Sequence, residues 1–150
     1  MALRVVNEGE VQLLRDLLAI DGTAGVVTLE AWTLKLFSNN YTPVEPDTSA
    51  NYTEATFTGY TSKPLIREGL AGHWSAPAAG AATGAWTTEA SVAEATYAAQ
   101  SWTALSAQTI YGYYVVGATS GKVIWAERFV AAQVLAINDV LTFTPRLGIS

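Results

Sequence analysis

The stretch TIYGYYVVGATSGKVIWAERFV, residues 109–130, decides the fold of this chain. Its two arms, residues 109–117 and 122–130, are rich in aromatic and β-branched side chains and flank the turn sequence ATSG at residues 118–121. Aromatic and β-branched side chains favour strands, and a turn that contains glycine lets two strands run back antiparallel. The sequence therefore predicts a β-hairpin, and we assign its residues 111–129 to the core.

Shorter strand signals lie on both sides of this hairpin. Residues 32–36 alternate apolar and polar side chains, which predicts a strand that ends at the turn pair Asn39-Asn40. The other candidates are bounded by glycine, proline or turn residues: residues 57–60, 65–66, 73–75 and 140–146. Roughly eight short strands at such spacing are typical of an antiparallel β-sandwich or jelly roll. We therefore expect a mainly β fold of this kind.

Two alanine-rich segments carry weaker signals. Residues 91–100 allow a helix by the spacing of their alanines and a strand by alternation, and we favour the strand. Residues 76–84 are almost entirely alanine, glycine and proline, so they offer few side chains from which a core could be built. For that segment we predict an exposed loop.

One helical pattern is present, at residues 7–20. Asn7 is suited to an N-cap, with Glu10 three residues later, and Asp21-Gly22 ends the pattern. Four apolar residues share one face of this helix: Val11, Leu14, Leu17 and Leu18. A helix of about three turns is marginal alone in water, so this stripe must dock either on its own domain or on a neighbouring subunit.

The helix defines the expected domain organisation and the candidate interface. We expect an N-terminal helix and linker over residues 1–25 and a β-sandwich over residues 26–150, forming one domain overall, as the length of 150 residues favours. Docking on a partner would make four residues the interface: Val11, Leu14, Leu17 and Leu18.

Composition restricts the classes of partner. Only 14% of the residues are charged while 50% are hydrophobic, which suits a protein that lies against other proteins. The formal net charge of -5 argues against nucleic acid. The chain has no cysteine, which leaves no disulfide or thiolate metal site. No stretch resembles a signal peptide or a membrane span, so we expect no membrane partner and synthesis in the cytoplasm.

Residues suited to catalysis or metal binding are few. His73 is the one histidine and directly precedes Trp74 in a strand candidate, so we expect a structural role for it. The acids Glu45, Asp47 and Glu54 fall in one loop region but lack the spacing of a dedicated calcium loop. No nucleophile elbow, phosphate loop or dinucleotide fingerprint occurs. We expect no catalytic residue, metal or cofactor, and no enzymatic activity.

The five tryptophans leave two interpretations open. Most lie in strand candidates, where burial is the expectation: Trp32, Trp74, Trp86, Trp102 and Trp125. If some of them are exposed, their rigid amphipathic rings would suit either a sugar-binding platform or a protein interface.

Several segments together resemble the capsid cement (decoration) proteins of tailed bacteriophages. They are residues 32–40 (WTLKLFSNN), 52–55 (YTEA), 57–60 (FTGY), 111–116 (YGYYVV) and 125–129 (WAERF). The resemblance extends from about residue 8 to residue 144 and rests on structural positions, without a catalytic motif. It implies a β-sandwich or jelly-roll protein, usually an oligomer, on the outer capsid surface where neighbouring capsomers meet.

The expected function is therefore that of a structural virion protein that stabilises the shell by bridging capsomers. Ligands that bind only correctly placed capsomers shift the equilibrium towards the intact shell, and many weak copies suffice. The expected partners are the major capsid protein and further copies of the chain, as a trimer first and a dimer second, on the capsid surface of the virion. The alternative is a virion adhesin or carbohydrate-binding module that uses exposed aromatic residues.

Overall fold

The computed structural model describes residues 31–44, 47–67, 73–76, 78–80 and 92–149. The chain divides into two compact units, which are treated separately below. One unit comprises Leu29–Ile66 and Gln100–Phe143, and the other comprises Met1–Thr28, Arg67–Ala99 and Thr144–Ser150. The expected N-terminal helix and its boundary near residue 25 lie outside the described residues, so both stay predictions.

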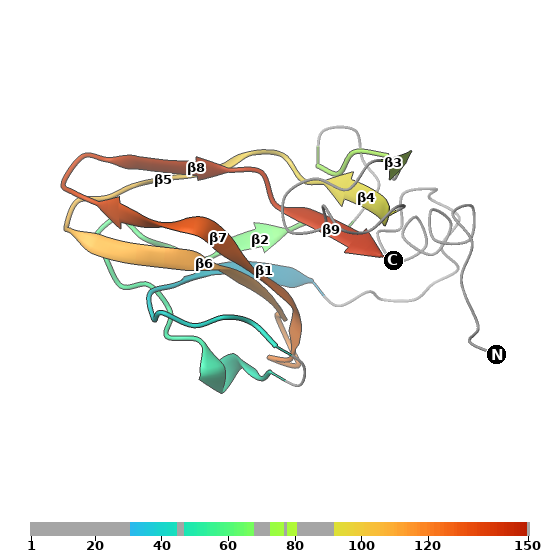
Figure 1. Ribbon diagram of the computed structural model, residues 1–150, viewed down its shortest axis with the longest axis horizontal. Helices are drawn as coiled ribbons and strands as arrows, with labels where there is room; N and C mark the ends of the chain where they lie inside the picture. The colour runs from blue at the N-terminus through green and yellow to red at the C-terminus, as the bar shows by residue number, and fades with distance from the viewer. Residues whose placement is uncertain (1–30, 45–46, 68–72, 77, 81–91, 150) are drawn as a thin grey trace. The chain divides into compact units, whose positions relative to one another are not determined.

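The described structure is mainly β with antiparallel pairing, which confirms the expected class at that level (Figure 1). The unit of Leu29–Ile66 and Gln100–Phe143 contains a four-stranded sheet in the order β2-β1-β6-β7. Its strands are β1 (Trp32–Phe37), β2 (Lys63–Leu65), β6 (Gln108–Gly117) and β7 (Val123–Leu135). The same unit contains a two-stranded ladder of β5 (Gln100–Thr103) and β8 (Val140–Phe143), and a 3-10 helix at Ser49–Asn51.

The predicted hairpin is confirmed as β6 and β7. The backbone N–H of Gly117 donates to the carbonyl oxygen of Lys122 at 2.9 Å, which closes the turn. Gly121 has a φ of 66°, a left-handed conformation that glycine adopts without steric cost. The second strand is longer than predicted, because β7 continues past Val130 to Leu135.

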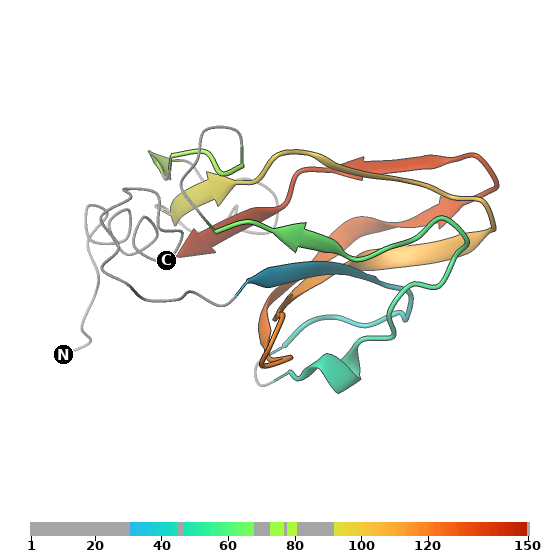
Figure 2. The same cartoon turned by 180° about the vertical axis from the view of Figure 1, so that it is seen from behind.

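Aromatic rings join the two sheets of this unit. The ring centroid of Phe143 on β8 lies 4.9 Å from that of Tyr113 on β6 and 5.6 Å from that of Trp102 on β5, stacked in both cases. Phe129 on β7 meets Phe143 edge-on at 5.2 Å. Figures 1 and 2 accordingly show the β5–β8 ladder alongside the β6–β7 hairpin. Such contacts bury large apolar rings and hold the two sheets together.

A second core cluster involves the segment that follows β1. Its buried members are Phe37, Tyr52, Tyr114 and Val116. The rings of Tyr52 and Tyr114 stack with their centroids 4.8 Å apart, and Phe37 packs against Tyr52 at 5.3 Å. The segment after β1 is thereby packed against β6.

The other unit contains the sheet β3-β4-β9, made of β3 (Ala78–Gly80), β4 (Val92–Thr96) and β9 (Arg146–Ile149). The strand interpretation of residues 91–100 is confirmed for residues 92–96 in β4 and for Gln100 at the start of β5, whereas residues 97–99 between them form no strand. The exposed loop predicted for residues 76–84 is wrong at β3, which pairs with β4. A segment of alanine and glycine can form a strand because the ladder is made by backbone N–H and C=O groups, which do not depend on side-chain size. Residues 77 and 81–84 lie outside the described part.

Three other strand predictions need correction. Residues 73–75 form no strand, because only Trp74 pairs, in an isolated bridge with Tyr97. Residues 57–60 form no strand, because Thr58 and Gly59 make a turn in which Gly59 has a φ of 95°. The strand predicted for residues 140–146 is interrupted at residues 144–145, between β8 and β9. Pro145 lacks the N–H that a continuous ladder would need at this point.

Candidate interaction surface

The interface predicted from the sequence lies outside the described residues. Nothing in the structure therefore places the four residues of the helical stripe: Val11, Leu14, Leu17 and Leu18. They stay a prediction, and a candidate surface must come from the described strands.

The described tryptophans belong mostly to the interior. Trp32, Trp74 and Trp102 are buried, as expected, while Trp86 lies outside the described residues. Trp125 is only partly buried and meets the Trp32 ring edge-on, with centroids 5.1 Å apart. The assignment of residues 111–129 to the core is thus too wide, because Trp125 on the outer strand β7 is only partly buried and residues 118–122 and Ile124 are exposed. These positions give little support to a sugar-binding platform of exposed tryptophans.

His73 has the structural surroundings expected for it. Its ring stacks on that of Tyr97 with centroids 5.8 Å apart, and its carbonyl oxygen accepts the backbone N–H of Ala98 at 2.8 Å. The neighbouring Trp74 pairs with Tyr97 in an isolated bridge. His73 therefore helps to hold residues 73–75 beside the end of β4.

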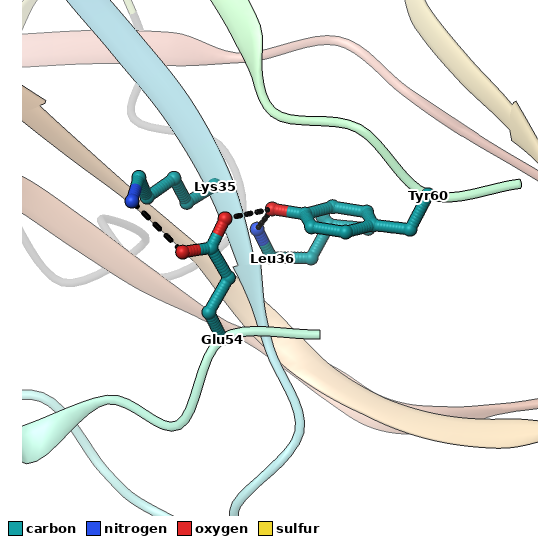
Figure 3. A network of polar contacts seen from close by, with 4 residues as sticks. All are labelled: Lys35, Leu36, Glu54 and Tyr60. Carbon is teal, nitrogen blue, oxygen red and sulfur yellow. Dashed lines mark hydrogen bonds and ion pairs between the residues drawn. The ribbon is translucent and has the colours of Figure 1, made fainter. Parts of the chain in front are cut away.

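Glu54 is the centre of a polar network that attaches a loop to β1 (Figure 3). One carboxylate oxygen of Glu54 accepts a hydrogen bond from the Tyr60 hydroxyl at 2.9 Å, and the other pairs with Lys35 Nζ at 2.8 Å. The Tyr60 oxygen in turn accepts the backbone N–H of Leu36 at 3.2 Å. Burial, with Glu54 adding to it, holds the pKa of Tyr60 well above its usual value, so the hydroxyl remains a donor. β2 pairs only with residues 32–34 of β1, and the network provides polar partners for the next two residues, Lys35 and Leu36.

Tyr60→Phe should destabilise this unit more than Lys35→Met. Loss of the hydroxyl leaves the Leu36 N–H and a Glu54 oxygen without their partner, which costs about 1–3 kcal/mol. The ion pair is about one-third exposed, so losing it should cost no more than about 1 kcal/mol. Urea unfolding of both variants measures the difference. Equal losses would mean that the hydroxyl attaches the loop no more strongly than the ion pair does, contrary to this prediction.

Asp47 is used in a second network. Its carboxylate accepts the hydroxyls of Tyr41 at 2.6 Å and Tyr52 at 2.7 Å, and the backbone N–H of Val44 at 2.9 Å. Within the described residues, no group of three or more His, Asp or Glu side chains could hold a metal ion. Asp47 and Glu54 each bind tyrosine hydroxyls, and Glu45 lies outside the described part.

Asp47 should make stability depend on pH on the acid side. Burial acts to raise the pKa of Asp47, but hydrogen bonds from Tyr41, Val44 and Tyr52 outweigh it and lower the pKa below its ordinary 3.8. A lowered folded-state pKa gives stability above the unfolded-state pKa, which is lost as pH falls through the folded-state value. Unfolding free energies measured from about pH 6 to pH 2 should fall less steeply in Asp47→Asn than in the wild type. Identical slopes would contradict this role.

Arg128 anchors the same loop to the hairpin. One guanidinium nitrogen donates to the carbonyl oxygen of Tyr41 at 2.7 Å, and another donates to the side-chain oxygen of Asn40 at 2.6 Å. The guanidinium also lies over the Tyr111 ring, 5.3 Å from its centroid. The described residues of the loop after β1 are therefore held to the rest of the unit at several points.

The candidate surface is an apolar edge, which we define as residues 129–140. β7 is an outer strand of its sheet among the strands described. Val130 is fully exposed, and the exposed fraction is 76% for Val134, 63% for Ile137 and 60% for Val140. Residues 129–138 (FVAAQVLAIN) contain no charged side chain. Single exposed aliphatic residues are ordinary, whereas four within eleven residues form a patch of the kind that marks interaction sites.

A bulge makes part of this edge protrude. Ile110 faces Gln133 and Gly112 faces Arg128, so one residue of β6 stands opposite the four residues 129–132. The side-chain amide of Gln133 donates to the Ala131 carbonyl oxygen at 2.8 Å. Bulges commonly interrupt pairing along an edge strand. At the bulge, the outer edge of β7 therefore offers a possible partner apolar side chains and not an unbroken row of backbone N–H and C=O groups.

The sequence contains a signal for this edge that the prediction of its strands did not use. The run of residues 129–138 without charge is visible in the sequence, but the second arm of the predicted hairpin ends at Val130, and no strand is predicted for residues 131–137. Their exposure depends on β7 lying at the outside of the sheet, which is a property of the topology.

Comparisons with protein-family models and with curated proteins identify no relative. No protein-family model matches the chain, and no curated protein matches it. Among the residues that the structure describes, no helix is long and apolar enough to cross a membrane.

Proposed function

We propose that this chain is a structural protein that acts by binding other protein surfaces, as a cement protein on the outer capsid of a tailed phage. In this role it bridges neighbouring capsomers, with the major capsid protein and further copies of itself as partners. The four-stranded sheet and the β5–β8 ladder would be the two layers of a β-sandwich. The chain would need no cofactor and would catalyse no reaction.

The apolar edge is the observation that carries this proposal. Burying the exposed aliphatic side chains of this edge against another protein would be worth about 1.5–3 kcal/mol for each large residue, which favours such a contact. Networks around Glu54, Asp47 and Arg128 support the proposal, because a loop held at several points suits a rigid binding module. The resemblance of residues 32–40 and 111–116 to cement proteins supplies the capsid as the surface.

Cosedimentation of the purified full chain with empty capsids of tailed phages tests the proposal. Saturable binding, together with a higher temperature of shell opening, is the expected result, since a ligand of the intact shell stabilises it. A glycan array run in parallel provides the contrast. A chain that stays in the supernatant with every capsid and binds a glycan would instead be an adhesin or carbohydrate-binding module.

A further inference from the structure

We draw no further inference here: the strongest candidate, the apolar edge at the end of β7 and in the turn that leads to β8, belongs to the surface already described, and nothing in the structure shows what covers its exposed aliphatic side chains.

Discussion

Gly112→Ala should cost the unit of Leu29–Ile66 and Gln100–Phe143 about 3 kcal/mol or more, a large share of the roughly 5–15 kcal/mol by which an ordinary domain is stable. A Cβ atom at position 112 would lie 2.2 Å from the backbone oxygen of Glu127 and 2.7 Å from two ring carbons of Phe37. The Glu127 oxygen belongs to the paired strand β7, and Phe37 is fully buried, so neither can retreat. Urea unfolding followed by circular dichroism measures the loss.

A loss of stability at this position would differ from the usual effect of replacing a strand glycine, which is a gain. Alanine in place of a strand glycine usually stabilises by about 0.5–1 kcal/mol. Gly121→Ala is the control: its Cβ would meet no atom within 4 Å, but its φ of 66° should cost about 1–2 kcal/mol. A Gly112→Ala variant as stable as the wild type would show that β6 and β7 can move apart, contrary to the packing described.

The hairpin and β1 could be predicted because their signals are local. Residues 109–130 combine strand-forming side chains with a turn that contains glycine. Residues 32–36 alternate apolar and polar side chains, and this pattern can be recognised without reference to any other segment. The need for glycine at position 112 could not be predicted, because it comes from the Glu127 backbone oxygen and the Phe37 ring on two other strands. The break at Pro145 was marked by the proline itself, yet the neighbouring apolar residues made residues 140–146 resemble one strand.

The candidate surface could not be predicted either, because it too depends on contacts between distant segments. An apolar residue in a strand is buried or exposed according to what lies beside the strand, so Val134 and Leu135 look alike in the sequence although only Leu135 is buried. The tyrosine and carboxylate contacts of Asp47 and Glu54 likewise join residues through a folded loop. In contrast, the helical stripe of residues 7–20 is a local pattern and stays a prediction.

Trp102→Ala should cost about 3–5 kcal/mol, as expected for a large buried ring in a core. The ring stacks on Phe143, and its Nε1 donates to the carbonyl oxygen of Thr61 at 2.8 Å. Lys63 Nζ lies 4.6 Å from the ring centroid, which adds a cation–π contact. The substitution would therefore remove the contact through which β5 packs on β8, together with a hydrogen bond to residue 61. Thermal and urea unfolding measure this loss.

Trp125→Ala is the matched comparison, and we expect it to cost clearly less than Trp102→Ala. Trp125 is only partly buried, so less apolar area returns to water when its ring is removed. Its edge-on contact with Trp32 would be lost, at about 0.5–1.5 kcal/mol beyond the area term. Measuring both variants at a low and a high protein concentration gives a further discrimination. If Trp125→Ala proves as costly as Trp102→Ala only at high concentration, a second copy covers Trp125, and β7 takes part in a contact between copies. If the two costs are equal at every concentration, Trp125 belongs to the core of its own chain, as the sequence alone had suggested.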